Sequence, residues 1–466
     1  MIVFGTDGWR GLIARDFTFD NVQRVSHATA DYIESLKTEE KKSVVIGYDT
    51  RFLSRKFAEE SAIVFASRGI AVLLTDGIST TPQVSLATLK KKATLGIVIT
   101  ASHNPPEYNG FKVKGSFGGP AKPEQIKEIE KFVKNYKPSK ALPEVQSFAE
   151  LVKSKLIKEF DANKLYQENI LKKIDIEAIT KAKFKIAYDA MHGAGLVTFQ
   201  QILPSISMLH GEINPSFGEI DHPEPIESCL PTLQSTLKNG KYSIGLATDG
   251  DADRLGVFDS DGIFIDSHKL FMILLQYLYH DRGLRGAVAK TVSLTSMVNK
   301  FCEKYSIPVF ETAVGFKYIA KLMVEEKILI GGEESGGLGT SLHIPERDGI
   351  FNGLLLLEIM AKKKKTLSQL CKDLENEFGT HYIARIDAKV SQNEKETILA
   401  ACKALPKKIG KYSVDSCNTL DGFKFLIGSS WLLVRASGTE PLIRFYAESS
   451  SKELAEELVQ LGRKLR

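Results

Sequence analysis

The chain has 466 residues, a length that exceeds a single hydrophobic core and predicts about three or four domains. Hydrophobic residues make up 43% and charged residues 26%, so the composition excludes disordered, collagen-like and coiled-coil proteins. The net charge of +5 is too small over this length to indicate a nucleic-acid or membrane partner.

The cysteine content and the N-terminus both favour a cytoplasmic protein. The five cysteines are widely spaced and form no C-x-x-C pair, so neither a disulfide framework nor a zinc site is predicted. The N-terminus lacks the basic and long apolar segments of a signal peptide. The most apolar stretch, residues 270–279, has about half the length that a membrane span needs. We therefore expect a cytoplasmic protein with neither membrane nor nucleic acid as a partner.

Residues 1–140 alternate between strand-like and helix-like segments, which predicts a first α/β domain. The alternation is visible in three segments: an apolar run at 44–49, helical spacing at 57–66 and a second apolar run at 70–74. A buried strand at 95–100 leads directly into the polar loop 101–105, a position at which α/β folds carry catalytic groups. Prolines at 137–143 predict a linker at the end of this domain.

Residues 160–265 repeat this pattern and predict a second α/β domain. Its strand at 244–247 ends in the loop Asp249-Gly250-Asp251-Ala252-Asp253-Arg254. The segments Ile46-Gly47-Tyr48-Asp49 and Ile186-Ala187-Tyr188-Asp189 are locally alike and lie about one domain length apart. This likeness indicates a duplicated fold, although it is too short to prove one.

Two further units complete the chain. Residues 266–375 form a third α/β unit, in which a strand at 328–330 runs into the Gly-rich loop 331–337. Residues 380–466 form the last unit. It contains strands at 431–434 and 442–446, with a loop at 435–441 between them. A terminal amphipathic helix follows at 452–465.

Asp249, Asp251 and Asp253 alternate with small residues, so a tight loop can turn three carboxylates toward one point. Their mutual repulsion calls for a cation, and hard oxygen ligands favour Mg²⁺. An Asp-rich turn exposed to water is the alternative interpretation. An EF-hand is excluded, because Arg254 and Ser260 occupy the positions where its glycine and glutamate belong.

Ser102 is a candidate nucleophile, because its hydroxyl adjoins His103 at the end of a predicted strand and Lys112 follows ten residues later. An ordinary Ser/Asn turn is the alternative for this loop alone. A G-x-S-x-G element does not surround Ser102, which weakens an acyl-transfer interpretation.

Three other loops could bind parts of a phosphorylated ligand. The loop between the last two strands combines a guanidinium, two hydroxyls and a glycine, a set suited to a phosphate: Arg435, Ser437, Gly438 and Thr439. Glu333, Glu334 and Ser335 suit the vicinal hydroxyls of a sugar, and Arg10 lies among glycines near the N-terminus. Each loop by itself is also compatible with a plain turn.

Taken in order, five loops resemble the signature of the α-D-phosphohexomutases. They are F-G-T-D-G-W-R-G, T-A-S-H-N-P, D-G-D-A-D-R, G-E-E-S-G-G and R-A-S-G-T-E-P, and they extend from Phe4 to Pro441. The resemblance implies three related α/β domains with mixed sheets and a smaller C-terminal α+β domain around a central cleft.

The resemblance also implies roles for single residues. Ser102 would carry a phosphoryl group, and the bound Mg²⁺ would be held by Ser102, Asp249, Asp251 and Asp253. The transferring phosphoryl group would be surrounded by Arg10, His103, Lys112 and Arg254, with Lys112 exchanging a proton with the sugar hydroxyl. Glu333 and Ser335 would bind sugar hydroxyls. The phosphate that does not react would be held by Arg435, Ser437, Gly438 and Thr439, and further positive charge would come from Lys290, Lys317 and Arg347.

The implied reaction moves phosphate between the 1- and 6-positions of a hexose through glucose 1,6-bisphosphate, which also acts as activator. Phe316 stands where family members with dual mannose and glucose specificity carry His, which favours glucose 1-phosphate and glucose 6-phosphate. The alternatives are a phosphomannomutase, a phosphoglucosamine mutase or, less favoured, a sugar-phosphate phosphatase. We expect small-molecule sugar phosphates as partners and a monomer or weak homodimer.

Overall fold

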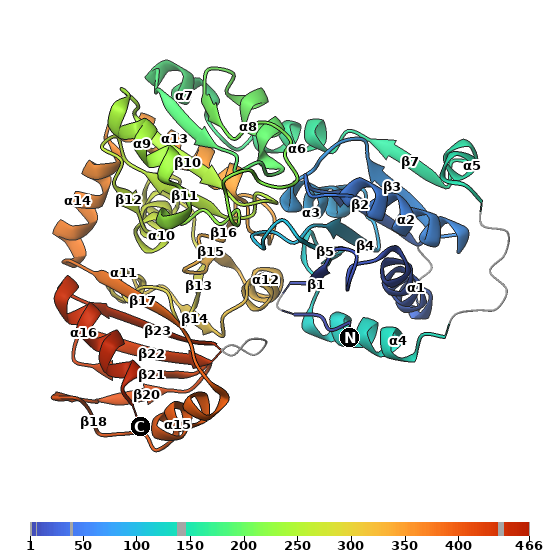
Figure 1. The fold of residues 1–466 in the computed structure, drawn as a ribbon. Coiled ribbons are helices and arrows are strands. Elements are labelled where there is room, and N and C mark those ends of the chain that lie inside the picture. The colour runs from blue at the N-terminus through green and yellow to red at the C-terminus, as the bar shows by residue number, and fades with distance from the viewer. Residues whose placement is uncertain (1, 6, 38–40, 138–145, 437–441, 466) are drawn as a thin grey trace.

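The computed structural model describes residues 2–5, 7–37, 41–137, 146–436 and 442–465 (Figure 1). Most of the predicted linker at 137–143 lies outside these residues. Among the described residues, no helix is long and apolar enough to span a membrane.

The first domain contains a mixed sheet. Its strands, in spatial order, are β1 (Trp9–Leu12), β5 (Tyr108–Gly115), β4 (Leu95–Ile99), β2 (Ser43–Tyr48), β3 (Ala71–Thr75) and β7 (Ile157–Phe160), and β6 (Gly119–Pro120) pairs with β5. Strands β4, β2, β3 and β7 are parallel to one another, whereas β5 pairs antiparallel with both β4 and β1. Strand β7 follows the predicted linker and still joins this sheet.

Helices cover both faces of the first sheet. One face packs against α1 (Phe19–Ser35), α2 (Ser54–Ser67) and α4 (Pro123–Asn135), and the other against α3 (Thr81–Lys90) and α6 (Ala162–Ile170). The short α5 (Phe148–Lys153) packs against α2 and β7. Val44 and Ile46 therefore face one helical layer and Val45 the other, which explains the unbroken apolar run in β2.

The second domain has a smaller mixed sheet. Its strand order is β12 (Phe264–Ile265), β11 (Leu255–Phe258), β10 (Ile244–Thr248), β8 (Ile186–Asp189) and β9 (Ser207–Leu209). The helices of this region are α7 (Ile176–Ala182), α8 (Gly195–Ile202), α9 (Pro231–Asn239) and the 3₁₀ turn Glu227–Cys229. Strands β10, β8 and β9 are parallel, and β11 and β12 are antiparallel additions.

The third domain repeats this plan. Its strand order is β14 (Val309–Thr312), β13 (Ala287–Thr291), β15 (Ile328–Gly332) and β16 (Leu338–Thr340). Its helices are α10 (Ser267–Gln276) with the π turn Tyr277–Asp281, α11 (Met297–Lys304), α12 (Phe316–Glu325), α13 (Gly349–Lys363) and α14 (Leu367–Phe378). Helix α13 is buried along residues 349–360 and packs on strands of both the second and the third domain, so these two domains share one hydrophobic core.

One strand order recurs in all three α/β domains. The sets β3-β2-β4-β5, β9-β8-β10-β11 and β14-β13-β15-β16 each contain three parallel strands and an antiparallel fourth. The likeness between residues 46–49 and 186–189 thus falls on β2 and β8, which occupy equivalent places. In every set, one of the sequence motifs lies where the third strand leads into the fourth: residues 100–105, 249–254 or 332–337.

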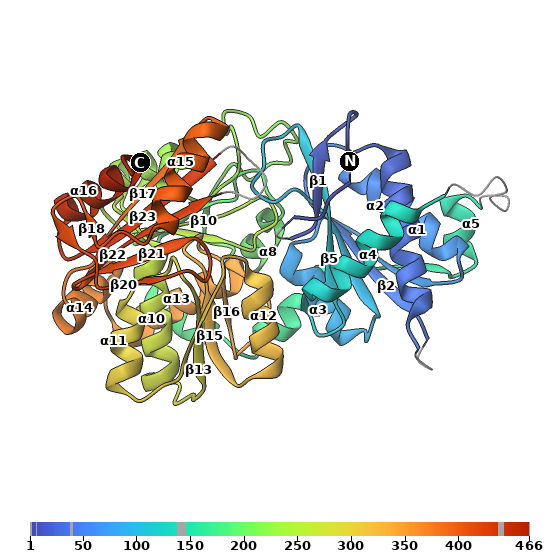
Figure 2. The ribbon, with the colours of Figure 1, turned by 90° about the horizontal axis from the view of Figure 1, so that it is seen from below.

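The C-terminal domain is an antiparallel sheet with two helices. Its strand order is β17 (Tyr382–Lys389), β23 (Leu442–Ser449), β22 (Ser430–Ala436), β21 (Phe423–Ile427) and β20 (Ser416–Asn418), with a separate pair β18 (Lys408–Ile409) and β19 (Tyr412–Ser413). The helices are α15 (Gln392–Lys403) and α16 (Lys452–Arg463). This architecture confirms the predicted fold class, and Figures 1 and 2 show the first and last domains on opposite sides of the other two.

Candidate active site

Ser102 and the acidic loop meet where the first and second domains join. The Ser102 hydroxyl donates a hydrogen bond of 2.8 Å to Asp249 Oδ2, and both side chains are buried. Ser102 adopts a left-handed backbone conformation with φ of 53°, which is uncommon for a residue other than glycine. Its N–H donates to Thr100 Oγ1 over 2.9 Å, so the loop is held in this conformation locally.

Arg51 fixes the loop around Ser102 through hydrogen bonds to its backbone. Its fully buried guanidinium donates to the carbonyl oxygens of Ser102, Asn104 and Pro105 over 2.7, 2.5 and 2.8 Å. Sequence analysis missed Arg51. The available signal was its position three residues after the end of β2 at Tyr48, at the edge of the sheet where the other motif loops also lie.

The three carboxylates of the acidic loop fit a divalent cation. Oxygen atoms of Asp249, Asp251 and Asp253 lie within 4.8 Å of one another, and all three residues are buried. Asp251 Oδ1 and Asp253 Oδ1 accept no hydrogen bond from any residue that the structure describes. Burial and the two neighbouring carboxylates raise the pKa of Asp249 well above its usual range. A cation here would satisfy the unpaired oxygens and relieve the repulsion.

Lys112 projects from β5 into the same cluster. Its ammonium lies 2.7 Å from Asp251 Oδ2, 3.2 Å from Asp253 Oδ2 and 2.9 Å from Asp7 Oδ2. Burial alone lowers the pKa of Lys112, but these carboxylates outweigh burial and raise it above its usual value. In this arrangement Lys112 is a cation positioned to stabilise negative charge beside Ser102.

Arg10 and His103 lie around the same loop. Arg10 Nη1 donates to Asn104 Oδ1 over 2.6 Å. Burial, together with the nearby guanidinium groups of Arg254 and Arg10, holds the pKa of His103 well below its usual range. The imidazole is therefore neutral at physiological pH, and its Nδ1 has no hydrogen-bond partner among the described residues.

Arg254 of the second domain and Arg347 of the third add positive charge to the site. Arg254 donates from its backbone N–H to Asp249 and from Nη1 to Glu224, over 3.0 and 2.8 Å. Arg347 Nη2 donates to Asp253 Oδ2 over 2.6 Å and to Asp7 Oδ2 over 2.7 Å. Asp7 was not selected from the sequence, although it belongs to the N-terminal motif from which only Arg10 was taken.

In the predicted sugar-binding loop, the carboxylates of Glu333 and Glu334 have different hydrogen-bond partners. Glu333 Oε1 accepts from the Gly315 N–H over 2.9 Å, and burial raises the pKa of Glu333 to about 7 despite the nearby Arg347. Glu334 instead accepts from Ser293 Oγ at 2.5 Å and from Tyr446 OH at 3.3 Å. Glu334 therefore connects the third domain to the C-terminal one.

The remaining candidates occupy less central positions. Half-buried Ser335 lies in the same loop, and Lys317 on α12 places Nζ 5.4 Å from the Tyr318 ring centre. Lys290 Nζ donates to Thr295 O over 3.1 Å and to Asn299 Oδ1 over 2.6 Å, so these contacts keep it within the third domain. In the predicted phosphate-binding loop, Arg435 lies near the end of β22. The other three residues of that set lie outside the described residues: Ser437, Gly438 and Thr439.

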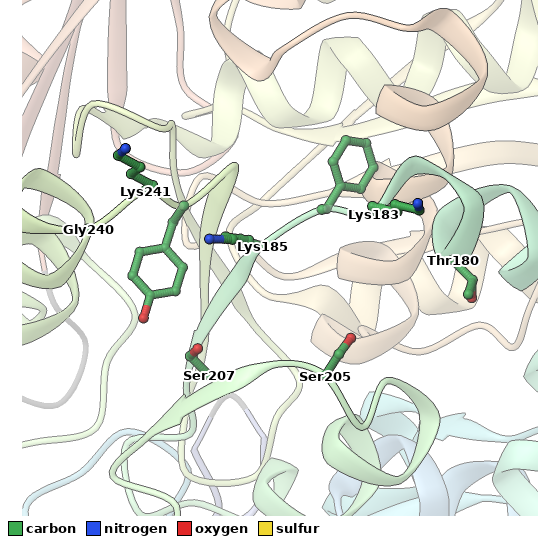
Figure 3. Close-up of a pocket in the computed structure, with 9 residues that line it drawn as sticks. Thr180, Lys183, Lys185, Ser205, Ser207, Gly240 and Lys241 are labelled. Carbon is green, nitrogen blue, oxygen red and sulfur yellow. The ribbon is translucent and has the colours of Figure 1, made fainter.

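A separate cavity of about 610 Å³ lies on the second domain (Figure 3). Its lining combines lysines and hydroxyl groups, including Lys183, Lys185, Lys241, Ser205 and Ser207. These residues lie near the N-terminal ends of β8, β9 and β10, whereas the acidic loop follows the C-terminal end of β10. The cavity is therefore at the opposite edge of the sheet from Ser102 and contains none of the predicted site residues.

The chain matches family descriptions along most of its length. The phosphoglucomutase/phosphomannomutase alpha/beta/alpha domains I, II and III match residues 1–140, 164–262 and 266–378. The C-terminal domain of the same family matches residues 386–462.

Relatives named for different sugar substrates are similar to the chain to about the same degree. A phosphoglucomutase/phosphomannomutase of Thermococcus kodakarensis is 31% identical, with 99% of this chain and 98% of that protein aligned. A phosphoglucosamine mutase of Carboxydothermus hydrogenoformans is also 31% identical, with coverage of 98% and 97%. A crystal structure assigned as a phosphomannomutase of Thermus thermophilus is 33% identical, has a TM-score of 0.86, and aligns over 100% of this chain and 98% of that one.

Proposed function

Because the chain belongs to the phosphoglucomutase/phosphomannomutase family of isomerases, which transfer phosphate within a sugar phosphate, we propose that it interconverts glucose 1-phosphate and glucose 6-phosphate. The transfer proceeds through phosphorylated Ser102 and bound glucose 1,6-bisphosphate. The observation that carries this proposal is the hydrogen bond between Ser102 and the buried acidic cluster, with Lys112 against the same carboxylates.

Asp249, Asp251 and Asp253, together with the oxygen on Ser102, would hold Mg²⁺. When bound, Mg²⁺ supplies neutralising charge for the phosphoryl oxygens. The unpaired oxygens of Asp251 and Asp253 support this assignment. Because phosphoryl transfer depends mainly on positioning and charge, the protein's own contribution is to align the groups around Ser102.

The cationic side chains have separate tasks. Arg10 and Arg254 stabilise charge on the transferring phosphoryl group, and neutral His103 can donate a hydrogen bond to it. Lys112 exchanges the proton of the sugar hydroxyl. A divalent cation on Asp251 and Asp253 would neutralise the carboxylates that keep Lys112 charged, so that Lys112 can accept this proton as the sugar oxygen bonds to phosphorus and the bond between phosphorus and Ser102 breaks. When the phosphoryl group returns to Ser102, the bond between phosphorus and the sugar oxygen breaks, and the Lys112 ammonium can donate a proton to that oxygen.

Glu333 and Ser335 bind sugar hydroxyls, Lys317 contributes positive charge, and Arg435 and its loop hold the phosphate that is not reacting. The choice of glucose rests on Phe316, whose ring is buried and lies 5.7 Å from the Arg347 guanidinium carbon. The family resemblance places a His at this position in members with dual specificity, and a phenyl ring cannot supply the hydrogen bonds of a His. This loss favours glucose over mannose.

Turnover of three substrates tests the proposal. Glucose 1-, mannose 1- and glucosamine 1-phosphate are assayed with a trace of the matching bisphosphate, using the parent protein and Ser102→Ala. We expect the highest kcat/KM with glucose 1-phosphate, and a loss of about 10³-fold or more in the variant, which still binds sugar phosphate. Highest turnover of another sugar would reassign the substrate. Undiminished turnover by the variant would overturn the nucleophile, and steady release of inorganic phosphate would indicate a phosphatase.

A further inference from the structure

Asp421 joins two parts of the site that belong to different domains. It lies in the turn between β20 and β21, with its side chain 23% exposed. Its Oδ2 atom accepts from Arg435 Nε over 2.7 Å within the C-terminal domain. The same oxygen accepts from the backbone N–H of Val314 in the third domain over 2.9 Å. One carboxylate oxygen thus fixes a guanidinium and a loop that approach it from opposite sides of an interface.

The next amide along the chain continues this connection. The Gly315 N–H donates to Glu333 Oε1 over 2.9 Å, so two consecutive amides contact Asp421 and Glu333 in turn. Gly315 has φ of 132°, a conformation that residues with a side chain rarely adopt. The turn is therefore shaped to present both N–H groups, and it links Arg435 to Glu333 through hydrogen bonds.

Both ends of the Asp421 contact are firmly held. The Val314 side chain packs against a hydrophobic cluster between the two domains, formed by Val292, Trp431, Leu433 and Tyr446. On the other side, Gly422 has φ of 89°, and a Cβ atom there would lie 2.4 Å from Val434 O. The turn that carries Asp421 is thus pressed against β22, the strand that ends near Arg435.

We infer that Asp421 is a positioning residue that couples recognition of the distal phosphate by Arg435 to alignment of Glu333 with the sugar. This inference rests on the proposed function, which gives Arg435 and Glu333 those tasks. A phosphate held by Arg435 keeps the C-terminal domain in its position against Val314. The same position allows the Gly315 N–H to donate to Glu333. Recognition of the sugar therefore depends on a phosphate bound in another domain.

Glu311 offers a matched control at the same interface. It accepts from Asn418 Nδ2 over 2.8 Å and from Lys424 Nζ over 3.3 Å, which also joins the third and C-terminal domains. None of these contacts involves Arg435, Val314 or Glu333. A general weakening of the interface would therefore affect Glu311→Gln and Asp421→Asn alike, whereas the coupling would respond to Asp421 alone.

Steady-state kinetics of Asp421→Ala, Asp421→Asn and Asp421→Glu tests the coupling. We expect Asp421→Ala to raise KM for glucose 1-phosphate about tenfold with a smaller change in kcat, and Asp421→Asn to have an intermediate KM. Asp421→Glu should recover part of the loss, and Glu311→Gln should stay within about twofold of the parent. An Asp421→Ala enzyme with the KM of Glu311→Gln would overturn the inference.

A double-mutant cycle identifies the path of the effect. If Asp421 acts through Arg435, then Asp421→Ala should cost little in an Arg435→Ala background. Losses that multiply independently would overturn the inference. Calorimetric titration of Ser102→Ala protein with glucose 6-phosphate provides a readout without turnover, in which adding Asp421→Ala should weaken binding about tenfold. Failure of the mutase proposal would appear as an inactive parent protein, and this titration would still decide the role of Asp421.

Discussion

Ser102 and Asp249 stand 147 positions apart in the chain, yet the hydroxyl of one donates to the carboxylate of the other over 2.8 Å. The contact requires their two loops to approach at the backbone. A Cβ atom added at Gly250 would lie only 2.4 Å from the Ser102 carbonyl oxygen. The juncture of the first two domains therefore depends on a glycine inside the acidic loop.

This close approach makes Gly250→Ala a sensitive test of the site. The added methyl group must push the acidic loop away from Ser102, and misplacement by about 1 Å lowers kcat by about 100-fold. Gly77→Ala is the control, because a Cβ atom there would meet nothing within 4 Å. Steady-state turnover of both variants provides the comparison. Equal activity of the two would mean that the loop spacing does not limit the reaction.

Removal of divalent metal should abolish turnover, because Asp249 and the unpaired oxygens of Asp251 and Asp253 then lack the cation that would hold them against the phosphoryl group. Excess chelator followed by graded Mg²⁺ gives the concentration for half-maximal activity. We expect Asp251→Asn to raise that concentration about tenfold or more. The exposed Asp261→Asn should leave it unchanged. Activity that persists in chelator would contradict the metal assignment.

Arg51→Lys should damage both stability and turnover, although it preserves the charge. A lysine cannot supply the several N–H groups that hold the carbonyl oxygens of Ser102, Asn104 and Pro105. Loss of buried charged hydrogen bonds costs about 3 kcal/mol, which thermal unfolding detects as a lower midpoint. Arg55→Lys is the control, because its side chain is 48% exposed. Matching midpoints for the two variants would show that Arg51 does not stabilise the loop.

The raised pKa of Glu333 predicts a stability that falls as the pH increases. Burial moves this pKa from 4.5 to about 7, so the folded state binds a proton that the unfolded state releases. The resulting stabilisation is complete below pH 4.5 and is lost as the pH rises through 7, with a magnitude on the order of 3 kcal/mol.

Thermal midpoints of the parent and Glu333→Gln, measured from about pH 5 to pH 8 without substrate, check this sign. The glutamine stays neutral throughout, so the midpoint of the parent should fall relative to that of the variant as the pH rises. Parallel curves would show that Glu333 is already ionised at the lower pH.

Local patterns in the sequence identified the strands, the loops that follow them and the residue types that these loops carry. Apolar runs such as residues 95–100 predict buried strands because period and hydrophobicity act over a few neighbouring residues. The loop motifs also identified the family, since each combines a turn with groups suited to phosphate, metal or sugar. Ser102, Lys112 and the three aspartates could be selected in this way.

Only the tertiary structure decided which of these groups meet. Asp7 and Arg347 are 340 positions apart and pair at 2.7 Å, while the neighbouring carboxylates Glu333 and Glu334 go to different partners. Such choices depend on how the four domains pack together. A contact between domains produces no periodic pattern in the sequence. The role of Asp421 belongs to this class, because its turn gains a second partner only when the C-terminal sheet lies against the third domain.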